Sequence, residues 1–147
     1  MPDVETRDRS GMEVLDAAEC WKLLAEAQVG RLAVAILDHP DIFPINHVVD
    51  DHSIVFRTAE GTKLAAAVLG RGVAFEVDGY DAESGQAWSV VLKGWATEIE
   101  RVEDLLSAED LPLFPWNAAP KSRWVRVEPQ DVSGRRFAVV DGLVQQH

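Results

Sequence analysis

Residues 31–58 read RLAVAILDHPDIFPINHVVDDHSIVFRT, and this stretch decides the fold class. It contains three runs of mostly apolar and β-branched residues, at positions 31–37, 42–49 and 53–58. Turn-forming residues at 38–41 and 50–52 separate the runs. Such runs are typical of strands, and links this short join antiparallel neighbours, because parallel strands need a longer crossover. The stretch therefore predicts two consecutive β-hairpins.

Three further strand-like runs follow, at 72–80, 87–99 and 123–129, and residues 132–140 can extend the last of them. Gly94 interrupts the longest run and predicts a bulge or a close approach of another backbone. Helices enter only as insertions: one follows Asp16, and others are expected at 62–69 and 101–108, with an irregular loop at 111–120. Six strands in series with so few helices predict a mainly β fold, a small antiparallel barrel.

The first helix has a recognisable start. Asp16 followed by Glu19 has the form of a capping box, and apolar residues then repeat at helical spacing. Gly30 is expected to end the helix. Cys20 lies on the apolar side, so we expect a buried, inert thiol. A single cysteine allows no internal disulfide, which is in keeping with a reducing compartment.

Composition limits the classes of function. The chain has 147 residues, of which 47% are hydrophobic, and this suits one domain with a real core. Residues 1–12 read as a polar, flexible tail without an apolar signal core, so we expect a single domain at 13–147 and a cytoplasmic protein. No apolar run is long enough to span a membrane. A formal net charge of −11 argues against nucleic acid as a partner.

Cations and hydroxyls gather where the third run meets the next helix. Arg57 and Thr58 end the strand, and Thr62 and Lys63 follow a glycine turn at the expected start of the helix. Backbone N–H groups at a helix start favour an anion. In so acidic a chain, this clustering predicts a phosphate site. A plain strand-to-helix turn with solvated charges accounts for the same spacing equally well.

The second run alternates between two faces. Pro44, Asn46 and Val48 share one face, and His47 lies on the other. Because proline cannot donate to a ladder, this strand is expected to have an open edge near Pro44. Such an edge could offer backbone groups to a planar heterocycle, although an ordinary edge strand is the simpler interpretation.

Other candidates are more isolated. Trp88 can wall a pocket or belong to the core, and Ser89 beside it can donate to a phosphate or a ring. Trp116, in a proline-rich segment, can cap a pocket or pack across a subunit interface. Arg135 belongs to a pair of arginines that solvation alone would explain. The four histidines lack zinc spacing and no nucleophile motif is present, so redox chemistry would need an organic cofactor.

Taken together, these segments resemble the pyridoxamine 5′-phosphate oxidase-like family of flavin-binding split barrels, and within it the small actinobacterial proteins akin to 5-nitroimidazole-resistance proteins. The resemblance covers about residues 14–139. It is carried by the order of these segments: Val29-Gly30-Arg31-Leu32-Ala33, Pro44-Ile45-Asn46-His47-Val48-Val49, Phe56-Arg57-Thr58, Gly61-Thr62-Lys63, Phe75-Glu76-Val77-Asp78, Trp88-Ser89-Val90, Pro115-Trp116, Trp124-Val125-Arg126-Val127 and Gly134-Arg135-Arg136.

The resemblance implies a six-stranded split β-barrel that forms a homodimer with FMN at the subunit interface. Arg57, Thr58 and Lys63 would hold the FMN phosphate and nearby ribityl oxygens, and the segment from Pro44 to Val48, with Asn46 and His47, would lie along the ring. Trp88 and Ser89 would come from the fifth strand beside the cofactor. Trp116 and Arg135 would reach it from the other subunit.

The sequence also departs from the family pattern. The C-terminal substrate-phosphate ligands of true pyridoxamine phosphate oxidases are not found after Phe137, and His47 stands where many relatives have tyrosine. We therefore expect a flavin-dependent oxidoreductase with a small-molecule substrate or electron acceptor, and no catalytic residue is identified. The alternatives are a non-enzymatic flavin- or haem-binding protein and a deazaflavin-dependent reductase.

Overall fold

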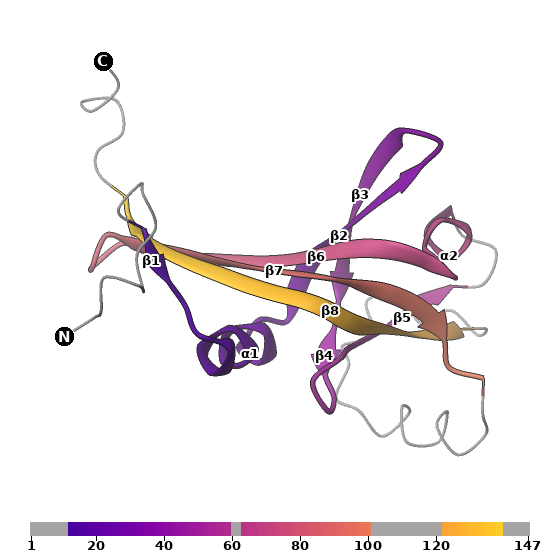
Figure 1. Cartoon of the computed structure of the whole chain (residues 1–147), viewed down its shortest axis with the longest axis horizontal. Helices are drawn as coiled ribbons and strands as arrows, with labels where there is room; N and C mark the ends of the chain where they lie inside the picture. The colour runs from indigo at the N-terminus through magenta and orange to yellow at the C-terminus, as the bar shows by residue number, and fades with distance from the viewer. Residues whose placement is uncertain (1–11, 60–62, 101–121, 140–147) are drawn as a thin grey trace.

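The computed structural model describes residues 12–59, 63–100 and 122–139. These residues form eight strands and two helices (Figure 1). The elements in chain order are β1 (Glu13–Val14), α1 (Ala17–Glu26), β2 (Val29–Ile36), β3 (His39–Asn46), β4 (Val48–Val49), β5 (Ile54–Ala59), α2 (Lys63–Val68), β6 (Arg71–Asp81), β7 (Gln86–Glu98) and β8 (Ser122–Ala138).

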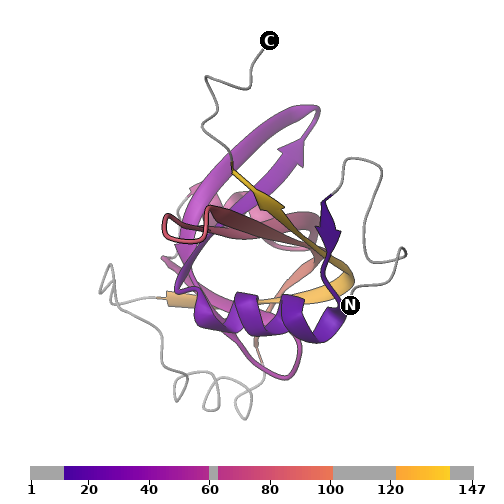
Figure 2. The same ribbon diagram turned by 90° about the vertical axis from the view of Figure 1, so that its left-hand side faces the viewer.

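The strands form one antiparallel sheet. Its order is β3-β2-β6-β7-β8-β5-β4, and β1 pairs with β8 beside this path. Figure 2 shows that the sheet curls around a common interior and that α1 lies across the side left open. The inner face of the sheet and α1 enclose the core, in which Phe56, Phe75, Leu32 and Leu24 are fully buried. The expected mainly β, antiparallel barrel is confirmed.

The predicted number of strands was wrong for the described residues, because the sheet has eight strands rather than six. One addition is β1, which is only two residues long and leaves no clear pattern in the sequence. The other arises because the run at 42–49 is interrupted at His47, which separates β3 from β4. There the His47 N–H donates to the carbonyl of Gln28 at 3.2 Å, outside the strand ladder.

Both predicted hairpins exist, but the first turn lies earlier than expected. Leu37 and Asp38 have φ values of 50° and 65°, and His39 already belongs to β3. Asp51 and His52 form the second turn, with φ values of 50° and 54°. Two consecutive positive φ values are the type I′ pattern that matches strand twist. Asn-Gly usually marks such turns, so the leucine gave no signal of this one.

The termini of α1 follow elementary capping chemistry only in part. The Glu19 N–H donates to Asp16 Oδ1 at 2.8 Å, which confirms the predicted N-cap. The helix ends at Glu26, before the predicted stop. Gly30 instead lies in β2 beneath the ring of Phe75, where a Cβ atom would overlap that ring. Cys20 is buried as expected, and burial raises the pKa of its thiol.

Two long strands, β7 and β8, run the length of the molecule (Figure 1). Their register shifts between Lys93 and Gly94, which confirms the predicted irregularity. A Cβ atom on Gly94 would overlap the carbonyl oxygen of Glu128 on β8. The two expected pieces of the last strand, 123–129 and 132–140, form the single strand β8.

β3 is the terminal strand of the sheet next to β2, which confirms the open edge expected from Pro44. The N–H of Ile42 on this strand donates to Asp41 Oδ1 at 3.0 Å. The helix expected at 101–108, the loop at 111–120 and the tail up to residue 11 lie outside the described residues. Within the described ranges, no helix has the length and apolar character needed to cross a bilayer.

Candidate anion and cofactor site

Arg57 is the strongest candidate for binding an anion. It lies in β5 directly opposite Trp124 of β8, and its guanidinium carbon is 5.5 Å from the centre of the indole ring. The side chain is half-buried, and no carboxylate of the described residues lies within ion-pair distance of it. A half-buried guanidinium keeps its charge and offers a planar set of N–H donors. In a chain of net charge −11, such a group is suited to a phosphate.

Neighbouring arginines differ from Arg57 in having acidic partners. Arg126 Nη2 lies 3.0 Å from Asp50 Oδ2, and the same guanidinium donates to Ser53 Oγ. Arg123 Nε lies 3.7 Å from Glu98 Oε2. These pairs neutralise Arg123 and Arg126 locally. Arg57 is therefore the half-buried cation of this region that keeps its charge available.

The remaining parts of the predicted phosphate motif do not all face the same way. Alternation along β5 places Thr58 on the inner face, where it is buried, whereas Arg57 lies on the outer face with Trp124. Lys63 opens α2, and its side chain is 82% exposed. Because α2 has only six residues, its dipole contributes little to binding an anion. Thr62 lies outside the described residues.

Lys63 already has an acidic neighbour. Its Nζ atom lies 3.5 Å from Asp41 Oδ2 on β3, while Oδ1 of the same carboxylate accepts the Ile42 N–H. The aspartate is thus held by the backbone of β3 and faces the lysine. An exposed pair of this length is weak, so a ligand phosphate could compete for the lysine.

The predicted ring-binding segment is divided between two environments. Pro44 is exposed and Asn46 is half-buried, and both belong to the outer face of β3. Val48 packs against a small outer cluster formed by Val55, Ile99 and Trp124. The structure therefore brings Val48 to the cluster that contains Trp124, the residue on whose ring Arg57 lies. His47, on the opposite face, does not join them.

His47 is a core residue. Its side chain is buried, its Nε2 atom lies 2.8 Å from the carbonyl oxygen of Leu24, and its ring meets that of Phe75 edge to face at 4.7 Å. A carbonyl only accepts, so Nε2 carries the proton. Burial lowers the pKa of the imidazole and favours the neutral form. A side chain enclosed in this way is not positioned to touch a ligand on the outer face.

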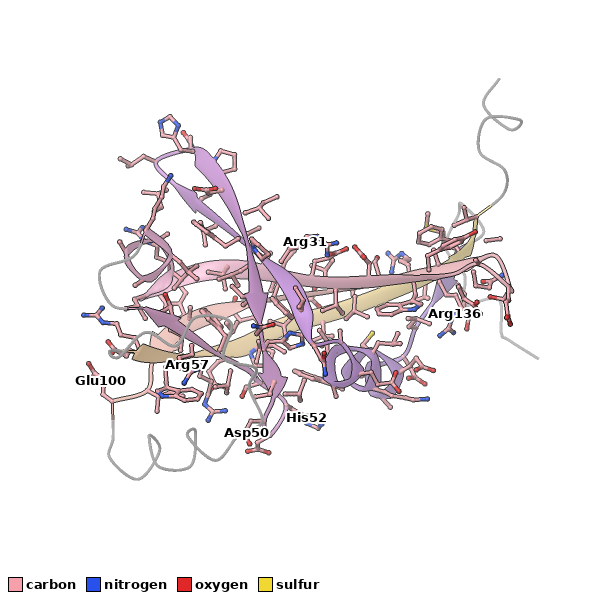
Figure 3. The ribbon with its side chains drawn as sticks, turned by 180° about the vertical axis from the view of Figure 1, so that it is seen from behind. Arg31, Asp50, His52, Arg57, Glu100 and Arg136 are labelled. Carbon is pink, nitrogen blue, oxygen red and sulfur yellow. The ribbon has the colours of Figure 1, made fainter. Side chains whose placement is uncertain are left out.

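Trp88, Ser89 and Arg135 lie at the other end of the sheet. Ser89 pairs with Arg135 of β8, and the indole of Trp88 covers Gly79 of β6 and packs against the core. Ser89 precedes Glu98, the end of β7 near Trp124, by nine residues, which is roughly 30 Å along a strand. Figure 3 shows the same separation, with Arg57 and Arg136 at opposite ends. One copy of the chain does not bring these residues to Arg57, and Trp116 lies outside the described residues.

A separate charged cluster lies on the outer face where β2 meets β6. Arg31 Nη1 lies 3.0 Å from Glu76 Oε1 and 3.4 Å from Asp78 Oδ2. Partial burial and the hydrogen bond and charge of Asp78 raise the pKa of Glu76 to about 7, against the opposing effect of Arg31. At neutral pH this carboxyl is therefore partly protonated and partly ionised. The described residues contain no group of three acidic, histidine or cysteine side chains suited to a metal ion.

Trp124 is the residue that sequence reasoning missed. It begins the segment Trp124-Val125-Arg126-Val127, but nothing in the sequence assigns it a role. Arg57 and Trp124 are far apart in the chain and meet only because β5 pairs with β8. The available signal was an arginine and a tryptophan on two predicted strands, without any indication that these strands are neighbours.

Comparison with known proteins agrees with this architecture. Residues 16–136 match the family model described as pyridoxamine 5′-phosphate oxidase. An uncharacterized protein of Mycobacterium tuberculosis is 35% identical over 128 residues, which cover 84% of each chain. A solved FAD binding protein from Mycobacterium smegmatis is 42% identical, with a TM-score of 0.81 over 86% of this chain and 99% of that one. A protein of unknown function from Corynebacterium diphtheriae is 37% identical, with a TM-score of 0.74 over 88% and 98%.

The match to the family model spans far more than half of the chain, and the relatives are similar over nearly their whole length. The mainly β, antiparallel barrel fits the resemblance drawn from the sequence segments. The chain belongs to the pyridoxamine 5′-phosphate oxidase family.

Proposed function

We propose that the protein binds a flavin nucleotide through its phosphate and carries out flavin-dependent oxidation or reduction of a small molecule. The observation that carries the proposal is Arg57, a half-buried guanidinium that lies against Trp124 with no carboxylate of the described chain beside it. The fit of this group to a phosphate is chemical: it is planar, charged and rich in donors.

A relative supports the choice of a flavin. The Mycobacterium smegmatis protein that is 42% identical to this chain is described as FAD binding. The sequence motif around Arg57 and Lys63 points to FMN. Both nucleotides carry the isoalloxazine ring and a phosphate next to the ribityl chain, so Arg57 would serve either of them. Their relative affinities distinguish the two.

Each of these residues would have its own role in binding the flavin. Arg57 would bind the phosphate, and Lys63 would turn from Asp41 to join it. Pro44, Asn46 and Val48 would line the ring from the outer face of β3 and β4. When bound, the flavin supplies hydride or electron transfer, and the protein supplies binding, orientation and electrostatic tuning.

A homodimer is part of this proposal. Ser89 and Arg135 lie at the far end of the sheet from Arg57, so a second copy would have to supply them to the same ligand. Exposed apolar side chains on the described surface, such as Trp95 and Ile42, are suited to an interface of this kind. Light scattering that returned only monomers at micromolar concentrations would remove this part of the proposal.

A non-enzymatic flavin binder is the second candidate, and one observation favours it. His47, the proton donor nearest to the proposed ring in sequence, is buried, neutral and bonded to Leu24. It cannot donate a proton to a ligand on the outer face. Anaerobic reduction of the loaded protein by a nicotinamide donor, followed by reoxidation with candidate acceptors, separates an enzyme from a binder.

The test of the binding site itself uses flavin fluorescence. FMN, FAD and riboflavin are titrated into the wild type, Arg57→Ala and the matched control Arg123→Ala. Loss of a charged hydrogen bond should weaken the binding of FMN to Arg57→Ala by about ten- to a hundredfold. Arg123 is already paired with Glu98, so its replacement should have little effect. Equal affinity of the wild type and Arg57→Ala for FMN would contradict the assignment.

A further inference from the structure

The neighbour of Arg57 across the sheet is an aromatic ring, although acids are close by in the fold. Glu98 and Asp50 lie beside the same strands, yet they pair with Arg123 and Arg126. Arg57 faces Trp124 instead, in direct register. The arrangement keeps the nearby carboxylates away from one particular cation.

Trp124 is held firmly enough to fix its neighbour. It is buried, and it packs in the outer cluster against Val55 and Ile99. Its backbone pairs with β5 on one side, and its carbonyl accepts the Ile99 N–H at 2.8 Å on the other. An indole in this setting has little freedom to move, so the guanidinium that lies on it is restrained as well.

An aromatic face and a carboxylate restrain an arginine with different consequences. A carboxylate would neutralise the charge and occupy two of the N–H donors. A ring attracts the cation through its quadrupole and leaves the charge and the in-plane donors free. Since the entropy of ordering the long side chain has already been lost in the free protein, an arriving anion does not have to bear that cost.

We infer that Trp124 is a positioning residue, which holds the guanidinium of Arg57 ready for the phosphate of the bound nucleotide. This inference rests on the proposed function, because it acts through Arg57. It assigns to the indole no contact with the ligand. Its role is to make Arg57 a selective site for a phosphate-bearing flavin over one that lacks the phosphate.

The experiment measures the ratio of the riboflavin and FMN dissociation constants in the full chain. Trp124→Met removes the aromatic face and should weaken FMN binding by about two- to thirtyfold. Riboflavin binding should change by less than about twofold, because riboflavin has no phosphate. In the Arg57→Ala background, Trp124→Met should add nothing further to the loss of FMN affinity. Ile99→Val, in the same cluster, is the matched control and should leave the ratio unchanged.

The outcomes separate this inference from the proposal beneath it. If Arg57→Ala leaves FMN binding intact, the phosphate site itself is wrong. If Arg57→Ala weakens FMN binding and Trp124→Met does not, only the positioning role fails. Equal losses for FMN and riboflavin in Trp124→Met would show a merely structural residue and overturn the inference. Should Trp124→Met not fold, Trp124→Phe decides between the outcomes. Its weaker aromatic face should give a riboflavin-to-FMN ratio between those of the wild type and Arg57→Ala. A ratio equal to that of the wild type counts against the inference.

Discussion

His47 is hydrogen-bonded to the last turn of α1: its Nε2 atom lies 2.8 Å from the carbonyl oxygen of Leu24. The final carbonyls of a helix have no partner within the helix, and this bond satisfies one of them. The bond also ties the junction of β3 and β4 to the helix that covers the barrel. Burial lowers the pKa of the ring, against the opposing effect of this hydrogen bond, so His47 makes the stability of the fold depend on pH.

We expect the protein to lose stability in acid through His47. Its pKa in the fold lies below the ordinary value of 6.5, so the unfolded chain binds more protons as the pH falls through that value. This stabilisation of the folded state is complete above pH 6.5 and is lost as the pH falls toward the lower pKa of the folded state. Urea unfolding at about pH 5 and about pH 7.5 should show a smaller loss in His47→Gln than in the wild type.

The matched control is His39→Gln, because His39 is exposed at the start of β3. This variant should keep the acid sensitivity of the wild type. Glutamine at position 47 can still donate to Leu24, so the fold should survive its introduction. If the stability of His47→Gln depends on pH as strongly as that of the wild type, the buried imidazole is not the cause.

Glu76 should have the opposite effect on pH dependence. Its pKa rises from 4.5 to about 7 in the fold, so the folded state binds more protons than the unfolded chain within that window. The contribution of Glu76 to the stability of the folded state is complete below pH 4.5 and is lost as the pH rises through 7. Glu76→Gln removes the charge that Asp78 repels, so the variant should be more stable than the wild type at about pH 8. At about pH 5 the stabilities of the two proteins should differ less.

Unfolding in urea at the two pH values measures the effect of Glu76→Gln. Glu128→Gln serves as the control, because Glu128 is an exposed carboxylate on β8. A loss of stability in Glu76→Gln at high pH would mean that the ion pair with Arg31, at 3.0 Å, outweighs the repulsion from Asp78.

Gly94→Ala should destabilise the fold by about 1–3 kcal/mol, as expected when an added methyl group cannot be accommodated. The new Cβ atom would overlap the carbonyl oxygen of Glu128, and backbone cannot move aside as a flexible side chain can. Gly72→Ala is the control on the adjoining strand, since its nearest neighbours would be 3.9 Å away. Thermal unfolding of the two variants checks this directly, and equal midpoints would contradict the close approach.

Asp41→Asn should strengthen FMN binding by about two- to fivefold, the range expected when an exposed ion pair no longer competes for Lys63. Asparagine keeps an oxygen for the Ile42 N–H but removes the charge that faces the lysine. Calorimetry at low and high salt measures the change, which should shrink as salt screens the pair. If the affinity falls, Asp41 assists the site rather than competing with it.

Local chemistry was readable from the sequence. Alternation placed Pro44 and His47 on opposite faces, the Asp16 cap was correct, and Gly94 marked the irregular position of β7. Each of these features depends on near neighbours in the chain. The turn at Leu37 was not readable, because a leucine with positive φ is tolerated only when the surrounding hairpin enforces it.

Features that depend on strand order were not readable. The contact of Arg57 with Trp124 needs the pairing of β5 with β8, and the distance from Arg57 to Ser89 needs the register of β7. The helix expected at 62–69 was readable, because α2 spans Lys63–Val68 and begins at Lys63. That Lys63 lies beside Asp41 of β3 was not readable. Tertiary context decided these cases, and one sequence does not contain that context.

The open edge of β3 also determines how the protein behaves when crowded. The register of β3 with β2 directs the backbone N–H and C=O groups of positions 40, 42 and 44 away from β2, toward the open edge. Pro40 and Pro44 have no N–H, and the N–H of Ile42 is already bonded to Asp41. A strand arriving from another molecule would find acceptors here but no donors with which to continue a ladder. The outward positions 40, 42 and 44 therefore cannot continue a regular ladder with a strand of another molecule.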